Sequence, residues 1–113
     1  MLTLPQGIKV FVYTESTDMR RQLNGLAVLV REAFGREPQG GDLFVFRGRR
    51  GDMSKVLFHD GQGMCMLVKR LDRGVFVFAP HGQALPKSME ITAKQLAAFL
   101  SGMSLAQKDT SAT

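Results

Sequence analysis

The sequence has no tryptophan, one cysteine and two histidines among its 113 residues. The single cysteine, Cys65, cannot form an internal disulfide, and its place in an apolar run predicts a small buried hydrophobic side chain. Neither His59 nor His81 has cysteine, histidine or glutamate partners at the spacing of metal ligands. We therefore expect no metal site and no cofactor.

Long hydrophobic runs are also missing. No apolar stretch approaches the roughly 18 residues that a membrane span requires. The first residues do not form the basic region and apolar block of a signal peptide. The sequence therefore predicts a cytoplasmic protein with no membrane partner.

The sequence shows no pattern typical of a catalytic centre. The run RGRRGDMS at residues 47–54 fits neither the Walker phosphate-binding motif nor the dinucleotide fingerprint. Five aspartates lie close to a glycine or before a predicted helix, where turn and cap roles account for them. They are Asp18, Asp42, Asp52, Asp60 and Asp72. We therefore expect a protein that is not an enzyme and has no small-molecule substrate.

The composition is that of one globular domain. Hydrophobic residues make up 44% of the chain and charged residues 22%, and a chain of this length can bury about two thirds of its unfolded surface. We expect a single domain over residues 1–106. The small and polar residues 107–113 predict a disordered tail.

The predicted fold is α+β and centres on a β-meander. Four apolar runs, at residues 43–46, 55–58, 64–68 and 75–78, alternate with glycine-containing charged connections. A further strand is expected at residues 8–13. A long helix should begin at Met19, capped by Thr17 or Asp18, and end at Gly35.

Residues 85–90 are expected to lead into a short second helix, with Thr92 as its N-cap and Gln95 completing a weak capping box. These elements predict an antiparallel sheet of about five strands, with the long helix on one face and the C-terminal helix at an edge. A curled, barrel-like sheet is the alternative.

Positive charge is concentrated in the meander. The chain has 15 lysines and arginines against 10 acidic residues, and four of its five net positive charges lie between residues 47 and 73. The first and third connections of a meander emerge at the same end of the sheet, where their cations could follow a phosphate backbone. Alternatively, these charges merely discourage edge aggregation. The seven basic residues are Arg47, Arg49, Arg50, Lys55, Lys69, Arg70 and Arg73.

Three stretches carry a resemblance to a known family: TDMR at residues 17–20, NGLA at 24–27 and LFVFRGRRGDMSKVLFHDGQGMCMLVKRLDRGVFVF at 43–78. Together they resemble the TnpB-type accessory protein encoded by bacterial insertion sequences of family 66. The similarity runs from about Gly7 to Pro80, and more loosely over residues 91–100. One departure is that Phe58 and His59 precede Asp60, where the family often has tryptophan.

The resemblance implies a non-enzymatic helper in DNA transposition, encoded beside a separate transposase. Two hypotheses follow for its action. In the first, the seven basic residues bind DNA and engage about three to five phosphates. In the second, the protein docks the transposase of the same element without contacting DNA.

Overall fold

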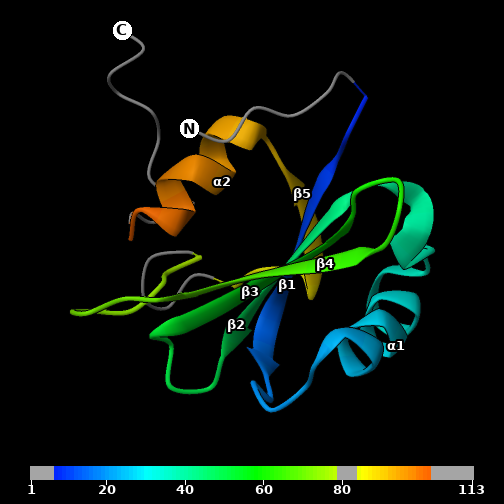
Figure 1. Cartoon of the computed structure of the whole chain (residues 1–113). Helices are drawn as coiled ribbons and strands as arrows, with labels where there is room; N and C mark the ends of the chain where they lie inside the picture. The colour runs from blue at the N-terminus through cyan, green and yellow to red at the C-terminus, as the bar shows by residue number, and fades with distance from the viewer. Residues whose placement is uncertain (1–6, 79–83, 103–113) are drawn as a thin grey trace, which may run out of the picture.

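The computed structural model describes residues 7–78 and 84–102. It shows an open five-stranded sheet with a helix on each face (Figure 1). The expected tail at residues 107–113 lies outside the described residues. The elements in chain order are β1 (Val10–Thr17), α1 (Leu23–Phe34), the 3-10 turn η1 (Pro38–Gly40), β2 (Leu43–Gly48), β3 (Met53–His59), β4 (Met64–Arg70), β5 (Ser88–Ile91) and α2 (Ala93–Leu100).

The sheet is mixed, with the strand order β4-β3-β2-β1-β5. β1 runs parallel to β2, with Val12 beside Val45, because α1 crosses over the sheet between them. The other neighbouring strands are antiparallel. The expected all-antiparallel sheet is therefore wrong in this pairing. The barrel alternative is also wrong, because β4 and β5 are separate edges.

The apolar run at residues 75–78 is not a strand of the sheet, as the meander had predicted. It crosses the face that carries α2, where Phe76 and Phe78 are buried and stack on Phe99 at centroid distances of 4.9 and 4.8 Å. Alternation of large apolar residues suits either a strand or a segment that covers a sheet. The fifth strand is instead β5, which overlaps the residues 85–90 that were expected only to lead into the second helix.

The long helix packs on one face of the sheet, as expected. Leu26 and Val30 are fully buried against Phe44, Phe46 and Leu57 of the sheet. Glycine ends the helix as expected, since the residue after Phe34 has a φ of 63°. Its start was predicted four residues too early: α1 begins at Leu23.

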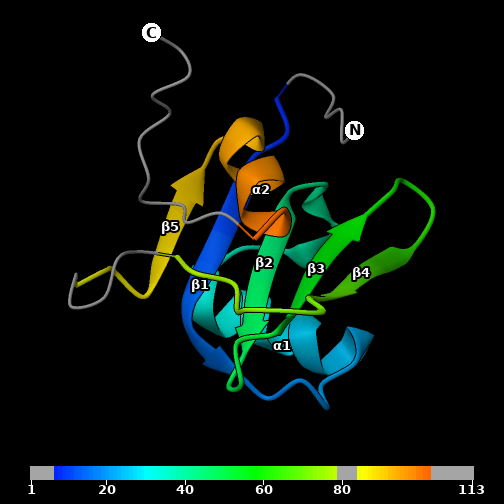
Figure 2. The same ribbon diagram turned by 90° about the vertical axis from the view of Figure 1, so that its left-hand side faces the viewer.

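The second helix has the expected start and an unexpected place. The Thr92 hydroxyl accepts a hydrogen bond from the backbone N–H of Gln95, and the Gln95 side chain accepts one from the N–H of Thr92. Leu96 and Phe99 are buried in the same cluster as Val12 and other residues of β1, β2 and β3. α2 therefore covers a face of the sheet rather than an edge (Figure 2).

β4 is an edge strand with one side unpaired in the described structure. Its burial falls along its length, and residues 67–70 are all exposed. Cys65 is only half-buried there, so the expectation of a buried thiol is wrong. No helix among the described residues is long and apolar enough to cross a bilayer.

Candidate nucleic-acid interface

Three segments that are far apart in the sequence meet at one end of the sheet. Because β1 and β2 are parallel, their last residues, Thr17 and Gly48, lie side by side. β3 starts at this end and β4 finishes there, with Met53 opposite Arg70. The prediction that the first and third connections share an end is confirmed, since the N–H of Leu71 donates to Asp52 O at 2.8 Å.

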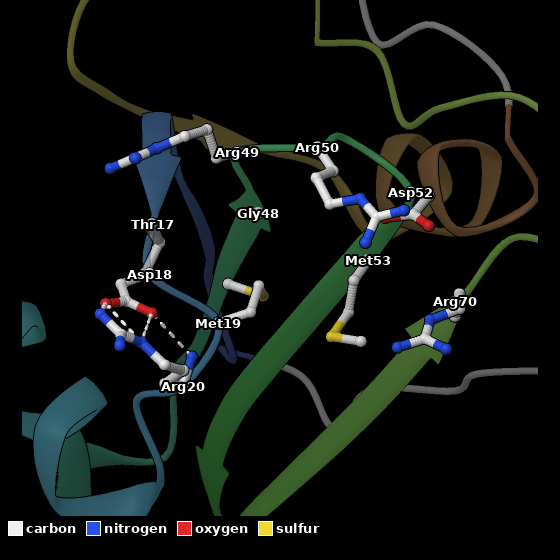
Figure 3. A pocket seen from close by; sticks show the side chains of 10 residues that line it. All are labelled: Thr17, Asp18, Met19, Arg20, Gly48, Arg49, Arg50, Asp52, Met53 and Arg70. Atoms are coloured by element: carbon white, nitrogen blue, oxygen red, sulfur yellow. Dashed lines mark hydrogen bonds and ion pairs between the residues drawn. The ribbon is translucent and has the colours of Figure 1, made fainter.

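A cavity of about 480 Å³ opens at this end, on the side of the sheet that carries α1. Four of its lining residues are arginines and two are aspartates, so its walls are net positive. In Figure 3 the guanidinium of Arg70 extends from β4 toward the side chain of Met53. The lining residues are Thr17, Asp18, Met19, Arg20, Gly48, Arg49, Arg50, Asp52, Met53 and Arg70.

Two exposed arginines lie on the turn between β2 and β3, and glycines fix that turn. The N–H of Gly51 donates to Gly48 O at 3.0 Å, which closes the turn around Arg49 and Arg50. Gly51 has a φ of 84°, and a Cβ there would lie 3.0 Å from Cβ of Val75. The local backbone therefore directs both arginine side chains outward.

The loop after β1 forms the wall of the cavity that faces the β2–β3 turn. Asp18 Oδ1 accepts hydrogen bonds from the Arg20 N–H at 2.9 Å and from Arg20 Nε at 3.0 Å, and its Oδ2 accepts one from a terminal guanidinium nitrogen at 2.7 Å. These bonds from the Arg20 side chain and backbone hold the pKa of Asp18 far below its usual range, and Arg49 adds to the effect. Asp18 is thus an ionised turn residue that orients Arg20.

Asp18 does not cap α1, as the sequence had suggested. The N-cap of α1 is Gln22, which makes no capping hydrogen bond through its side chain. Thr17 also fails in that role. Its hydroxyl oxygen is buried and has no hydrogen-bond partner among the described residues, although the residue lines the cavity.

Lys55 holds the loop after β1 onto β3. It is 4% exposed, and its Nζ donates to Met19 O at 2.8 Å and to Arg21 O at 2.7 Å. The ammonium group therefore provides a charged donor to two backbone carbonyls of this loop. Lys55 was expected among the DNA-binding residues, but the structure shows its side chain buried and bonded to the loop that carries Met19, a residue of the cavity lining.

Two more of the predicted cations are engaged on the opposite face, below α2. Arg47 donates to Phe76 O at 3.1 Å and its guanidinium lies 4.7 Å from the ring centre of Phe78, and burial lowers its pKa. Lys69 Nζ donates to the carbonyl of Leu100 at the end of α2. These contacts attach the crossing segment and the C-terminal helix to the sheet.

The remaining predicted residues are open. Arg49, Arg50 and Arg70 are exposed and line the cavity, and Arg73 is exposed in the turn that follows β4. Sequence reasoning missed Arg20, although the TDMR run was conspicuous. Its signal was the neighbouring Asp18, but its place opposite the β2–β3 turn depends on the parallel pairing of β1 with β2.

Met19 fits the cavity floor because the facing strand has a glycine. A Cβ at Gly48 would lie 2.5 Å from Cγ of Met19, which is closer than side-chain atoms approach one another. The TDMR and RGRRGD runs are therefore complementary surfaces of one structure. The two runs are far apart in the sequence, but both contribute residues to the same cavity.

Comparisons with known proteins identify the family of this chain. A family model described as IS66 Orf2 like protein matches residues 8–110. The chain is 44% identical over 103 residues to "Uncharacterized protein y4hO" of Sinorhizobium fredii (strain NBRC 101917 / NGR234), covering 91% of this chain and 87% of that protein. It is 40% identical over 80 residues to "Uncharacterized protein y4jC" of the same strain, covering 71% and 68%.

No solved structure matches the chain. The family match nevertheless spans nearly all of the described residues, including both walls of the cavity. The family is that of the accessory Orf2 protein of this type of insertion sequence, as distinct from its transposase. The chain therefore belongs to the IS66 Orf2-like family of TnpB-type insertion-sequence accessory proteins.

Proposed function

We propose that this accessory protein acts in transposition by binding DNA through the arginine-lined cavity and the turn beside it. The observation that carries the proposal is the gathering of exposed arginines from three segments at one sheet end, with two of them on a turn that a backbone hydrogen bond closes. Arginine forms bidentate contacts with phosphate oxygens, and the planar guanidinium suits a backbone that passes over the cavity mouth.

The structure reduces the number of cations that the proposal uses. Arg47, Lys55 and Lys69 donate to backbone carbonyls and are left out. Arg49, Arg50, Arg70 and Arg73 remain, and Arg20 joins them. With three or four of these reaching phosphates, the logarithm of the binding constant should fall with the logarithm of salt concentration at a slope of roughly −3 to −4 on duplex DNA.

The proposal is tested by replacing Arg49 and Arg50 together with alanine. The double variant should bind duplex DNA more weakly at all sequences, with a slope flatter by about one to two units, because phosphate contacts carry no base readout. Binding is measured by fluorescence anisotropy at several salt concentrations. The pair Lys9→Ala and Arg31→Ala is a matched control, since it removes two exposed cations outside the cavity lining.

An equal loss of affinity in both double variants would mean that only net charge matters. A parent protein that binds no DNA at low salt would overturn the proposal. In that case docking to the transposase of the same element, without DNA contact, becomes the function to test. Co-purification of the two proteins, with and without nuclease treatment, measures that alternative.

A further inference from the structure

The open edge of β4 has a regular set of unpaired backbone groups. At the two ends of the β3–β4 ladder, the N–H of Asp60 donates to Gly63 O and the N–H of Leu71 donates to Asp52 O. Hydrogen-bonded pairs alternate along an antiparallel ladder, and the register between these ends is unbroken. Cys65, Leu67 and Lys69 therefore direct their backbone groups to β3.

The alternate residues of β4 direct their N–H and C=O groups away from the sheet. These residues are Met64, Met66, Val68 and Arg70. No described element lies beyond this strand in the sheet order, and in Figure 2 β4 forms the margin of the sheet. A long edge of this kind is a template for pairing with another strand.

The side chains of β4 are apolar where an edge strand usually has charge. Leu67 and Val68 are each 46% exposed, and they lie on opposite faces of the sheet because they are neighbours in a strand. Residues 64–68 include no charged residue. The cations Lys69 and Arg70 lie only at the end of the strand, so they do not protect its middle.

Charge is distributed unequally along this edge. The turn before β4 contains Asp60, whose pKa is lowered by the backbone N–H groups of Gln62 and Gly63 that bind its carboxylate. The opposite end contains Lys69, Arg70 and Arg73. A second β4 in parallel would bring like charges together, whereas an antiparallel one brings its acidic turn to the basic end.

We propose that β4 pairs antiparallel with β4 of a second copy of this chain, about a two-fold axis beside Leu67. In this register Met66 lies opposite the partner's Val68, and Met64 lies opposite the partner's Arg70. All four residues with outward backbone groups are then paired, which no other register achieves. Leu67 meets the partner's Leu67 on the α2 side of the joined sheet.

The dimer would be a ten-stranded open sheet, in which both copies of α1 lie on one face. The two arginine-lined cavities would then open on that face at opposite ends of the paired strands. Because only two short strands form the contact, its area is at the small end of specific interfaces and its dissociation constant is in the micromolar range. The pairing itself does not depend on DNA binding.

Sedimentation without DNA tests the pairing directly. At about 100 µM, above a micromolar dissociation constant, the parent should have about twice the 12.5 kDa mass of the chain. Leu67→Lys and Leu67→Glu should each be monomeric, because like charges would then face each other across the axis. An equal mixture of these two variants should regain the dimer mass.

The matched control is Val28→Lys, a substitution at an equally exposed apolar residue on α1. It should leave the dimer intact. Circular dichroism and urea unfolding should show that all three variants remain folded. A parent that is monomeric at this concentration overturns the proposal, and so does a Leu67→Lys variant that is still a dimer or a mixture that does not pair.

Cysteine cross-linking reads the register independently. With Cys65 replaced by serine, Leu67→Cys should oxidise to a covalent dimer, because facing residues of a non-hydrogen-bonded pair have Cα atoms about 4.5 Å apart, within disulfide range. The parent's own Cys65 lies opposite the partner's Lys69 and should not cross-link. Equal cross-linking at the two positions would overturn the assigned register. DNA binding is measured separately, so failure of either proposal leaves the other standing.

Discussion

Basic side chains have different roles in the strands and in the turn at the basic end of the sheet. In the strands, three basic side chains donate to backbone carbonyls of segments packed on the sheet: Arg47 to the segment at residues 75–78, Lys55 to the loop after β1, and Lys69 to the end of α2. In the turn, Arg49 and Arg50 extend into solvent. A cation on a covered face becomes a structural donor, whereas a cation on a turn stays available to a ligand. Arg70 is on a strand but stays open, because nothing among the described residues covers the α1 side of the β4 end.

The sharpest way to break this comparison is Lys55→Met. Two carbonyls of the loop after β1 would lose a charged donor in a buried site, so unfolding should become easier by about 2 to 4 kcal/mol. Arg50→Met is the control, and its effect should stay within about 0.5 kcal/mol because exposed loop residues contribute little. Urea denaturation measures both. A Lys55→Met protein as stable as the parent would show that Lys55 is not a structural donor, and Lys55 would then again be a candidate DNA-binding residue.

Arg47→Ala and Arg49→Ala sharpen the comparison, since these residues are two positions apart. Arg47→Ala loses the bond to Phe76 O and the contact with the Phe78 ring, at a cost of about 1 to 3 kcal/mol. Its DNA-binding salt slope should not change. Arg49→Ala should do the reverse, with unchanged stability and a slope flatter by about one unit. Flattening of the slope by both variants would remove the distinction between strand and turn.

The smallest effect concerns two carboxylates that are held ionised in different ways. The pKa of Asp18 is lowered mainly by the Arg20 side chain, and that of Asp60 by backbone N–H groups. Salt screens an exposed ion pair, so in about 1 M salt the titration midpoint of Asp18 should rise more than that of Asp60. Carboxyl carbon NMR measures both midpoints.

The sign of the pH effect at Asp18 follows from its lowered pKa. Any stability that it contributes is present above the unfolded-state pKa, near 4, and is lost as the pH falls toward the folded-state value. Asp18→Asn should therefore make stability less dependent on pH below about 4. An Asp18 midpoint that does not respond to salt would show that its backbone contact with Arg20 dominates.

Local signals in the sequence predicted local structure well. The Thr92 and Gln95 capping box and the glycine end of the long helix depend on neighbouring residues, and both were confirmed. The sharing of one sheet end by the basic connections was also predictable, because it follows from hairpin connectivity. Each of these features needs no knowledge of distant partners.

Long-range pairing was the part that the sequence could not supply. The parallel alignment of β1 with β2 depends on how α1 packs, and it determines that Arg20 faces the turn. The VFVF run at residues 75–78 alternates like a strand, yet burial of Phe76 against Phe99 places it across the sheet. The anchoring role of Lys55 likewise requires a partner more than thirty residues earlier in the chain.

That last contact also orders events during folding. Lys55 is separated from the carbonyls that it binds by 36 and 34 residues, so the loop after β1 cannot be fastened until β3 has reached its place in the sheet. Closing a chain segment of this length has an entropic cost that must be met before the contact forms. One wall of the cavity is therefore expected to take shape late, and a nascent chain should lack the complete arginine-lined cavity until its central strands have paired.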